Sequence, residues 1–204
     1  MSLIDKRGLL PNIRFRNPII LELGCGNRKR IPDAIGIDIL DYECVDIVGD
    51  AVEVLRKIPD ATVDMVSSHH FLEHVANLDL LLQEVSRVLR IGGRFEVVVP
   101  HFSNPYYYSD PTHKHCFGLY TFSYLAEDRL LRKRVPNYNK TFFFCLEKVD
   151  LIFKSSPPFY FRHGVKRILG VIFNSCGYMQ EFYEENLCYI FPCYEIGYVL
   201  KRVN

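Results

Sequence analysis

The stretch Ile20-Leu21-Glu22-Leu23-Gly24-Cys25-Gly26 decides the fold of this chain. An apolar run from Pro18 to Leu23 breaks abruptly into two glycines around a cysteine, which is typical of a buried strand that ends in a turn. A side chain at either glycine would forbid the dihedral angles of the turn or keep a ligand away from the backbone. An acidic residue, Asp38, ends the next expected strand. These features indicate a nucleoside cofactor that lies across the carboxyl ends of a parallel sheet.

A dinucleotide is a poor fit to this turn. Dinucleotide sites use G-x-G-x-x-G, in which the third glycine lets the phosphate-binding helix pack closely. The third position here is Lys29, and Pro32 limits any helix before the next strand. We therefore expect a ligand without a pyrophosphate, a condition that S-adenosylmethionine (SAM) meets.

Four motifs, in order, resemble those of class I SAM-dependent methyltransferases of the type 11 kind. They are Leu21 to Gly26, Asp38, Val48 to Ala51 and Val88 to Phe95. The resemblance covers roughly residues 17–101. It implies SAM as the cofactor, with one carboxylate on the ribose and another beside the adenine. The cofactor-binding residues that it implies are Glu22, Gly24, Cys25, Gly26, Asp38, Ile39, Asp50, Ala51 and His69.

Strand and helix signals alternate through the first half of the chain. Strands are expected at 18–24, 34–39, 45–48, 63–68 and 95–99, and helices at 51–57 and 78–89, the latter closed by Gly92-Gly93. Alternation of this kind predicts a parallel sheet with helices on both faces. With two late strands at 141–146 and 194–200, we expect an α/β, Rossmann-like, doubly wound and mostly parallel seven-stranded sheet. Its last strand is antiparallel and its first helix is shortened.

The second half of the chain differs in composition. Residues 102–140 are rich in Tyr, Phe, His and Pro, with a helical patch expected near 119–131. Residues 155–193 are too long for a plain loop, so helices are expected at 166–173 and 181–189. We interpret 155–193 as a lid or substrate-binding insertion in one domain, 1–204, whose core is about 15–154 and 194–204.

Bulk properties exclude several classes of protein. The net charge of +1 indicates no general affinity for nucleic acid, and a basic run at 129–134 is typical of a solvated surface. Seven cysteines without a C-x-x-C pair favour reduced, cytoplasmic thiols. No signal peptide is evident, and no window reaches the ~20 apolar residues of a membrane span. These features leave the oligomeric state open.

Six of the seven histidines follow the fourth and fifth expected strands, where a ligand crevice is expected. A histidine there could accept the proton of a hydroxyl group as it is methylated. The candidate catalytic residues are His70, His74 and His113. The candidate substrate-binding residues are Glu73, His101, Tyr107, Asp110 and His115. At least half of the histidines, above all His163, are expected to serve structure only.

Two metal hypotheses compete with this interpretation. His70-Phe71-Leu72-Glu73-His74 matches H-x-x-E-H, a zinc-peptidase motif that needs both histidines on one helix face. A metal that assists methyl transfer is a second possibility, because histidine and carboxylate clusters bind zinc or iron. Similar His-x-Leu-Glu-His runs occur at this place in methyltransferases, and we expect no metal.

From two further segments we expect the acceptor to be a small molecule or a glycan-like compound. Ser68-His69-His70-Phe71 stands where DNA amine methyltransferases carry Asn/Asp-Pro-Pro-Tyr. Asp110-Pro111-Thr112-His113 resembles a segment of a bacterial methyltransferase subgroup associated with glycans or related small molecules. A histidine base favours transfer to oxygen. An RNA or protein methyltransferase, a non-catalytic SAM-binding protein and a metal hydrolase are the alternatives.

Overall fold

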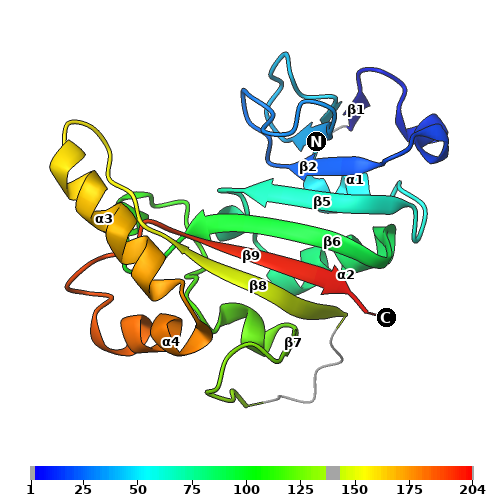
Figure 1. Cartoon of the computed structure of the whole chain (residues 1–204). Coiled ribbons are helices and arrows are strands. Elements are labelled where there is room, and N and C mark those ends of the chain that lie inside the picture. Colours follow the sequence, from blue (N-terminus) through cyan, green and yellow to red (C-terminus); the bar gives the residue numbers. More distant parts are fainter. Residues whose placement is uncertain (1–2, 137–142, 204) are drawn as a thin grey trace.

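Nine strands form one sheet in the computed structural model, which describes residues 3–136 and 143–203 (Figure 1). Their order is β1-β4-β3-β2-β5-β6-β9-β8-β7. The strands are β1 Ile4–Asp5, β2 Ile20–Leu23, β3 Ile35–Asp38, β4 Ile47–Val48, β5 Val63–His69, β6 Leu89–Pro100, β7 Glu127–Asp128, β8 Phe144–Ile152 and β9 Glu195–Arg202.

The central strands run parallel, as the sequence predicts. β4, β3, β2, β5 and β6 pair in parallel, and β9 is antiparallel to both β6 and β8. The expected mostly parallel sheet with an antiparallel last strand is therefore confirmed, with two-residue strands, β1 and β7, added at its edges. Because parallel strands end at the same edge, the residues after β2, β3, β5 and β6 lie together.

Burial explains why these segments form strands. Leu21, Glu22 and Leu23 of β2 are all buried, as is usual for a central parallel strand covered on both faces. In β6 the buried side chains alternate with exposed or partly exposed ones. Phe95, Val97 and Val99 face the core. β6 is therefore covered well on one face only.

The helices are few and short. They are α1 Ala51–Leu55, α2 Leu78–Val88, α3 Tyr160–Phe173 and α4 Gly177–Asn186. Asp50 caps α1, because its side chain accepts the N–H groups of Val52 and Glu53. In Figure 1, α1 and α2 lie behind the strands, whereas α3 and α4 lie to the left, near the arrowhead of β6. Residues 27–34, between β2 and β3, form no helix, so the first helix is missing rather than shortened.

Three predicted elements need correction. Residues 119–131 form a 3-10 helix, Thr121–Tyr124, and β7 instead of an α-helix. Asp128 accepts the N–H groups of Leu130 and Leu131 and the hydroxyl of Ser123, which gives the backbone an alternative to helical bonds. The glycines at 92 and 93 lie inside β6, since α2 already ends at Val88.

The third correction concerns the late strands. β8 extends far past the expected end at Leu146, to Ile152, and β9 extends to Arg202. Residues 141 and 142 of the expected strand lie outside the described residues. Within the described ranges no helix combines the length and hydrophobicity that a membrane span requires.

The insertion is held against β8 by side-chain amides. Asn174 donates to the carbonyl of Leu151 and accepts its N–H group, both at 2.8 Å. Gln180 of α4 donates to the carbonyl of Val149 at 2.7 Å. These bonds satisfy backbone groups of β8 that a further strand would otherwise pair with. They also fix α3 and α4 against the sheet.

Candidate active site

The glycine turn after β2 adopts the backbone that its sequence predicts. Gly24 and Gly26 have φ values of +66° and +58°, which side chains rarely tolerate. A Cβ at Gly24 would lie 2.6 Å from the Cβ of Phe71. Gly24 also donates its N–H to the carbonyl of Ile37 at 2.8 Å. The turn is thus wedged between β3 and the segment that follows β5.

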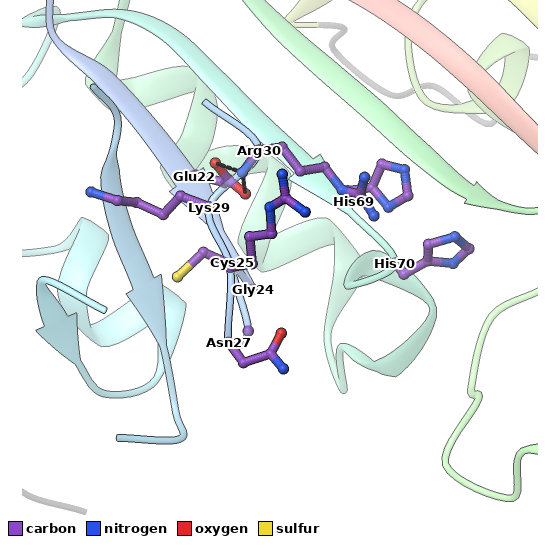
Figure 2. Close-up of a pocket in the computed structure, with 10 residues that line it drawn as sticks. Glu22, Gly24, Cys25, Asn27, Lys29, Arg30, His69 and His70 are labelled. Atoms are coloured by element: carbon purple, nitrogen blue, oxygen red, sulfur yellow. Dashed lines mark hydrogen bonds between the residues drawn. The ribbon is translucent and has the colours of Figure 1, made fainter. Parts of the chain in front are cut away.

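This turn borders a cavity of about 580 Å³ (Figure 2). The volume falls in the range of small-molecule sites. The cavity is lined by Glu22, Gly24, Cys25, Gly26, Asn27, Arg28, Lys29, Arg30, His69 and His70. It therefore runs from the glycine turn to the end of β5, which is where sequence reasoning places the cofactor.

Glu22 shapes the loop that replaces the missing helix. Its buried carboxylate accepts the backbone N–H groups of Arg30 and Ile31 at 2.9 to 3.0 Å. The side chain of Cys25 turns toward β3, because its Sγ lies 2.8 Å from where a Cβ of Gly36 would stand. Burial raises the pKa of the Cys25 thiol to about 12, so it is no nucleophile at neutral pH. Both residues build the wall of the cavity.

The acidic residues expected at the ribose and the adenine differ in their surroundings. Asp38 accepts the N–H of Gly26 at 2.8 Å through one oxygen and that of Leu40 at 2.9 Å through the other. Asp50 is engaged as the cap of α1. Asp38, Ile39, Asp50 and Ala51 are not among the residues that line the cavity.

His70 is held between two buried carboxylates. Its Nε2 lies 2.8 Å from Oε1 of Glu195, and its Nδ1 lies 3.2 Å from Oε1 of Glu73. Burial alone would lower the pKa of His70, but the bonds to Glu195 and Glu73 outweigh burial and raise it to about 9. His70 also has a φ of +53°, an unusual backbone for a histidine. It is therefore a cation at neutral pH.

Glu195 completes an ionic triad. The ammonium group of Lys154 lies 2.5 Å from the same Oε1 of Glu195. Burial would raise the pKa of Glu195, but its bonds to His70 and Lys154 prevail and lower it to about 2. The neighbouring His69 responds oppositely, because burial and the charge of His70 lower its pKa to about 4. The end of β5 thus carries one charged and one neutral imidazole.

A second cluster joins Glu73, His74 and His113. One ligand atom of each lies within 4.8 Å of the others. The backbone N–H groups of Lys114 and His115 donate to the carbonyl of Glu73, which ties the loop after β6 to the segment after β5. The rings of His74 and His113 lie 4.8 Å apart. The structure therefore brings three of the predicted acceptor-side residues together.

Other predicted residues serve packing. His101 is fully buried between Ser103 and Glu184 of α4, so its side chain links the end of β6 to the insertion. Nε2 of His115 donates to the carbonyl of Val75 at 2.8 Å. Tyr107 is buried and its ring stacks on that of His113. The predicted substrate-binding histidines, His101 and His115, therefore each have a hydrogen-bond partner within the protein.

Six residues at the site were not predicted, namely Asn27, Arg28, Lys29, Arg30, Lys154 and Glu195. Arg30 lines the cavity beside His69 (Figure 2). The one usable signal was Glu195, an acidic residue at the start of an otherwise apolar strand, since buried carboxylates usually have a charged partner. The identity of that partner was not readable from the sequence.

Comparisons with known proteins agree with this geometry. Residues 21–97 match the family model described as a methyltransferase domain. No curated protein sequence matches the chain. A SAM-dependent methyltransferase from Archaeoglobus fulgidus superposes with a TM-score of 0.58 at 20% identity, over 95% of this chain and 91% of that one.

A second structure is the Haemonchus contortus phosphoethanolamine N-methyltransferase 2 in complex with SAM. Its TM-score is 0.56 at 13% identity, and the match covers 92% of this chain but 49% of that one. At such identities the likeness concerns the fold. Residues 21–97 therefore match a methyltransferase domain, and the fold resembles that of SAM-dependent methyltransferases, in agreement with the predicted resemblance.

Proposed function

We propose that this protein transfers the methyl group of SAM to a hydroxyl oxygen of a small-molecule or glycan-like acceptor. The observation that supports this most is the cavity that runs from the glycine turn to His69 and His70. At one end the cavity exposes the backbone of the glycine turn and the side chains of Arg28 and Arg30. At the other end it is lined by the imidazoles of His69 and His70. A single cavity can therefore hold the donor and expose its methyl group to the acceptor side.

The cofactor roles follow the geometry of the turn. The amino-acid tail of SAM would lie on the backbone of Gly24 to Asn27, with Arg30 near its carboxylate. Asp38 would bind the ribose hydroxyls, because each carboxylate oxygen can accept a second hydrogen bond besides the one it has. Ile39, Asp50 and Ala51 would flank the adenine.

On the acceptor side, the charge state of His70 argues against a role as base. A protonated imidazole cannot accept a proton, so we assign His70 to orienting Glu73 and the end of β5. His74 and His113 each leave one ring nitrogen free of protein hydrogen bonds, as described below. Either could accept the acceptor's hydroxyl proton while the oxygen attacks the methyl carbon and the sulfonium leaves as S-adenosylhomocysteine.

The insertion, residues 155–193, would act as a lid over this acceptor side. Both of its flanks reach the site, since Lys154 precedes it and Glu195 follows it. Glu184 of α4 bonds to His101 at the end of β6. Movement of α4 would therefore shift His101 at the carboxyl edge of the sheet.

An RNA or protein acceptor receives less support. The cations of the basic run at 129–134 have partners within the chain: Arg129 pairs with Glu127, Arg132 lies over the Tyr178 ring and Lys133 lies over the Tyr120 ring. Such engagement is typical of a structural surface. A strongly salt-dependent affinity for RNA would favour this alternative instead.

Calorimetric titration with SAM and S-adenosylhomocysteine tests the proposal, followed by a screen of hydroxylated acceptors with SAM labelled in the methyl group. We expect micromolar binding and label transfer to an oxygen. Binding of SAM without transfer to any acceptor would favour a non-catalytic SAM-binding protein. No binding of either ligand would overturn the proposed function.

Asp38→Ala is expected to weaken SAM binding by roughly ten- to a hundredfold, because hydrogen bonds to a charged group are worth about 1.5–3 kcal/mol. The change also releases the N–H of Gly26, which loosens the turn. Asp33→Ala is the matched control, since Asp33 is exposed in the preceding loop. Equal SAM affinities of the two variants in calorimetry would contradict the ribose role.

His113→Ala is expected to lower the rate of methyl transfer by about a hundredfold or more while SAM affinity changes little. The reason is that His113 lies in the acceptor-side cluster and not among the residues that line the cofactor cavity. The rate is measured with labelled SAM, and affinity by calorimetry. His163→Ala, on α3, is the control. A loss of SAM affinity in His113→Ala would show that the role is misassigned.

A further inference from the structure

We propose that Glu73, His74 and His113 form a binding site for a divalent transition metal ion of the zinc type. The three side chains come from two segments, the 3-10 turn after β5 and the loop after β6. Two imidazoles and one carboxylate within 4.8 Å of one another are a donor set that zinc and iron(II) use. This proposal goes beyond methyl transfer and does not depend on SAM binding.

The carboxylate of Glu73 is the first observation that points to a cation. Its side chain is 1% exposed, yet its Oε2 atom has no hydrogen-bond partner. A buried carboxylate oxygen without a donor is costly, because burial removes its water. The other oxygen, Oε1, lies 3.2 Å from His70 and 4.0 Å from Nε2 of His74. A metal ion bound through Oε2 would satisfy the unpartnered oxygen.

The tautomers of the two histidines are the second observation. The hydroxyl of Thr112 donates to Asp110 at 2.6 Å, so its oxygen accepts from Nδ1 of His74 at 2.9 Å. Nδ1 of His113 donates to the carbonyl of Tyr107 at 2.8 Å. Both rings therefore carry their proton on Nδ1 and leave Nε2 as a lone pair. Metal-binding histidines show this same arrangement, with the other nitrogen donating to a fixed acceptor.

The Asp110-Pro111-Thr112-His113 loop explains the precision of this arrangement. Asp110 fixes the Thr112 hydroxyl and also accepts its N–H at 2.8 Å. The loop thus supplies one ligand, His113, and orients another, His74. Oδ2 of Asp110 lies 3.7 Å from Nε2 of His113, near enough to join the cluster as an oxygen donor. One short segment therefore accounts for most of the site.

A neighbouring cluster of His69, His70 and Glu195 is a weaker candidate. Two of its three potential metal ligands, His70 and Glu195, are already bonded to each other. Oε1 of Glu195 accepts from both His70 and Lys154. The ammonium group of Lys154 occupies the place of a cation there. At Glu73, His74 and His113 no lysine or arginine among the described residues forms an ion pair with the carboxylate.

The donor set also selects the class of metal. Mg²⁺ and Ca²⁺ prefer oxygen ligands throughout, whereas two imidazoles favour zinc and its neighbours. Three protein ligands leave at least one coordination position open. His74 is partly exposed, so solvent or an acceptor hydroxyl can reach that position. Coordinated there, a hydroxyl would have a lower pKa and would release its proton to solvent water, because the Nε2 lone pairs of His74 and His113 would then be bound to the metal.

The test is metal titration of the purified, tag-free chain after chelator treatment. Calorimetry with Zn²⁺ and absorption spectra with Co²⁺ are expected to show one ion per chain. His74→Ala and His113→Ala should each weaken Zn²⁺ binding by at least about tenfold. His163→Ala, on α3, and His69→Ala, in the neighbouring cluster, should leave it unchanged. Circular dichroism checks that each variant is folded.

Three results would overturn the proposal: no Zn²⁺ binding, binding that survives both His74→Ala and His113→Ala, or binding that is lost in His69→Ala alone. Should one of the two cluster variants fail to fold, the other still decides. SAM titration of the same samples tests the proposed methyl-transfer function separately from the proposed metal site. The chain can bind SAM without metal, or metal without SAM.

Discussion

Gly24→Ala is expected to lower the free energy of unfolding by about 3 kcal/mol and to abolish measurable SAM binding. Two costs add at this residue. The left-handed backbone, at φ +66°, costs an alanine about 1–2 kcal/mol. The new Cβ would lie 2.6 Å from Phe71, and such overpacking costs about 1–3 kcal/mol. Relief requires the segment after β5 to move, which displaces His69 and His70.

Two glycines of the same chain separate these costs. Gly8 and Gly26 have φ values of +61° and +58°, but no atom lies within 4 Å of a Cβ built on either. Gly8→Ala and Gly26→Ala should therefore show the backbone cost alone, about 1–2 kcal/mol. Urea unfolding measures all three variants. If Gly24→Ala is no less stable than Gly8→Ala, close packing of the turn against Phe71 does not add to the cost of a side chain at Gly24.

Glu195→Gln is expected to cost about 2–3 kcal/mol, less than the ~3–5 kcal/mol for breaking a fully buried ion pair, because the side chains of His70 and Lys154 are 35% and 39% exposed. Glu195 is 3% exposed and is the shared partner of His70 and Lys154. Its neutralisation removes the charge that compensates both cations, while the solvent that reaches His70 and Lys154 offsets part of the loss. Asp150→Asn is the matched control, because the pair of Asp150 with Lys148 is exposed and surface pairs contribute about 0–1 kcal/mol.

The pH dependence of stability gives a second readout of the triad. The raised pKa of His70 means that its contribution is present below its ordinary pKa of 6.5 and is lost as pH rises through about 9. The lowered pKa of Glu195 means that its contribution is present above 4.5 and is lost as pH falls through about 2. The triad therefore contributes most between pH 4.5 and 6.5.

In Glu195→Gln the decline of stability between pH 6.5 and 9 should shrink, since His70 loses its strongest partner. Urea unfolding at a series of pH values measures this arm for wild type, Glu195→Gln and Asp150→Asn. An unchanged alkaline arm in Glu195→Gln would mean that His70 is not held as a cation.

Much of the fold was predictable because its signals are local. The glycine turn, the caps and the alternation of apolar segments lie within a few residues of the structures they form. Errors arose where side chains compete with the backbone, as Asp128 does in the segment expected to be helical. The paired glycines at 92 and 93 were expected to end a helix, but they lie inside β6. Glycine suits both places, because the pairing of β6 with β5 changes register between Leu89 and Arg94.

The candidate site was predictable only in its location. The sequence by itself determined the turn at Gly24 to Gly26, the strand ends that form one edge and the gathering of histidines there. Only the tertiary structure decided what each histidine can do: His70 is charged by Glu195, 125 residues away in the chain, and His101 is buried by Glu184. The physical reason is that the charge and tautomer of an imidazole depend on the groups around it. Those groups come from distant segments that only the folded chain brings together.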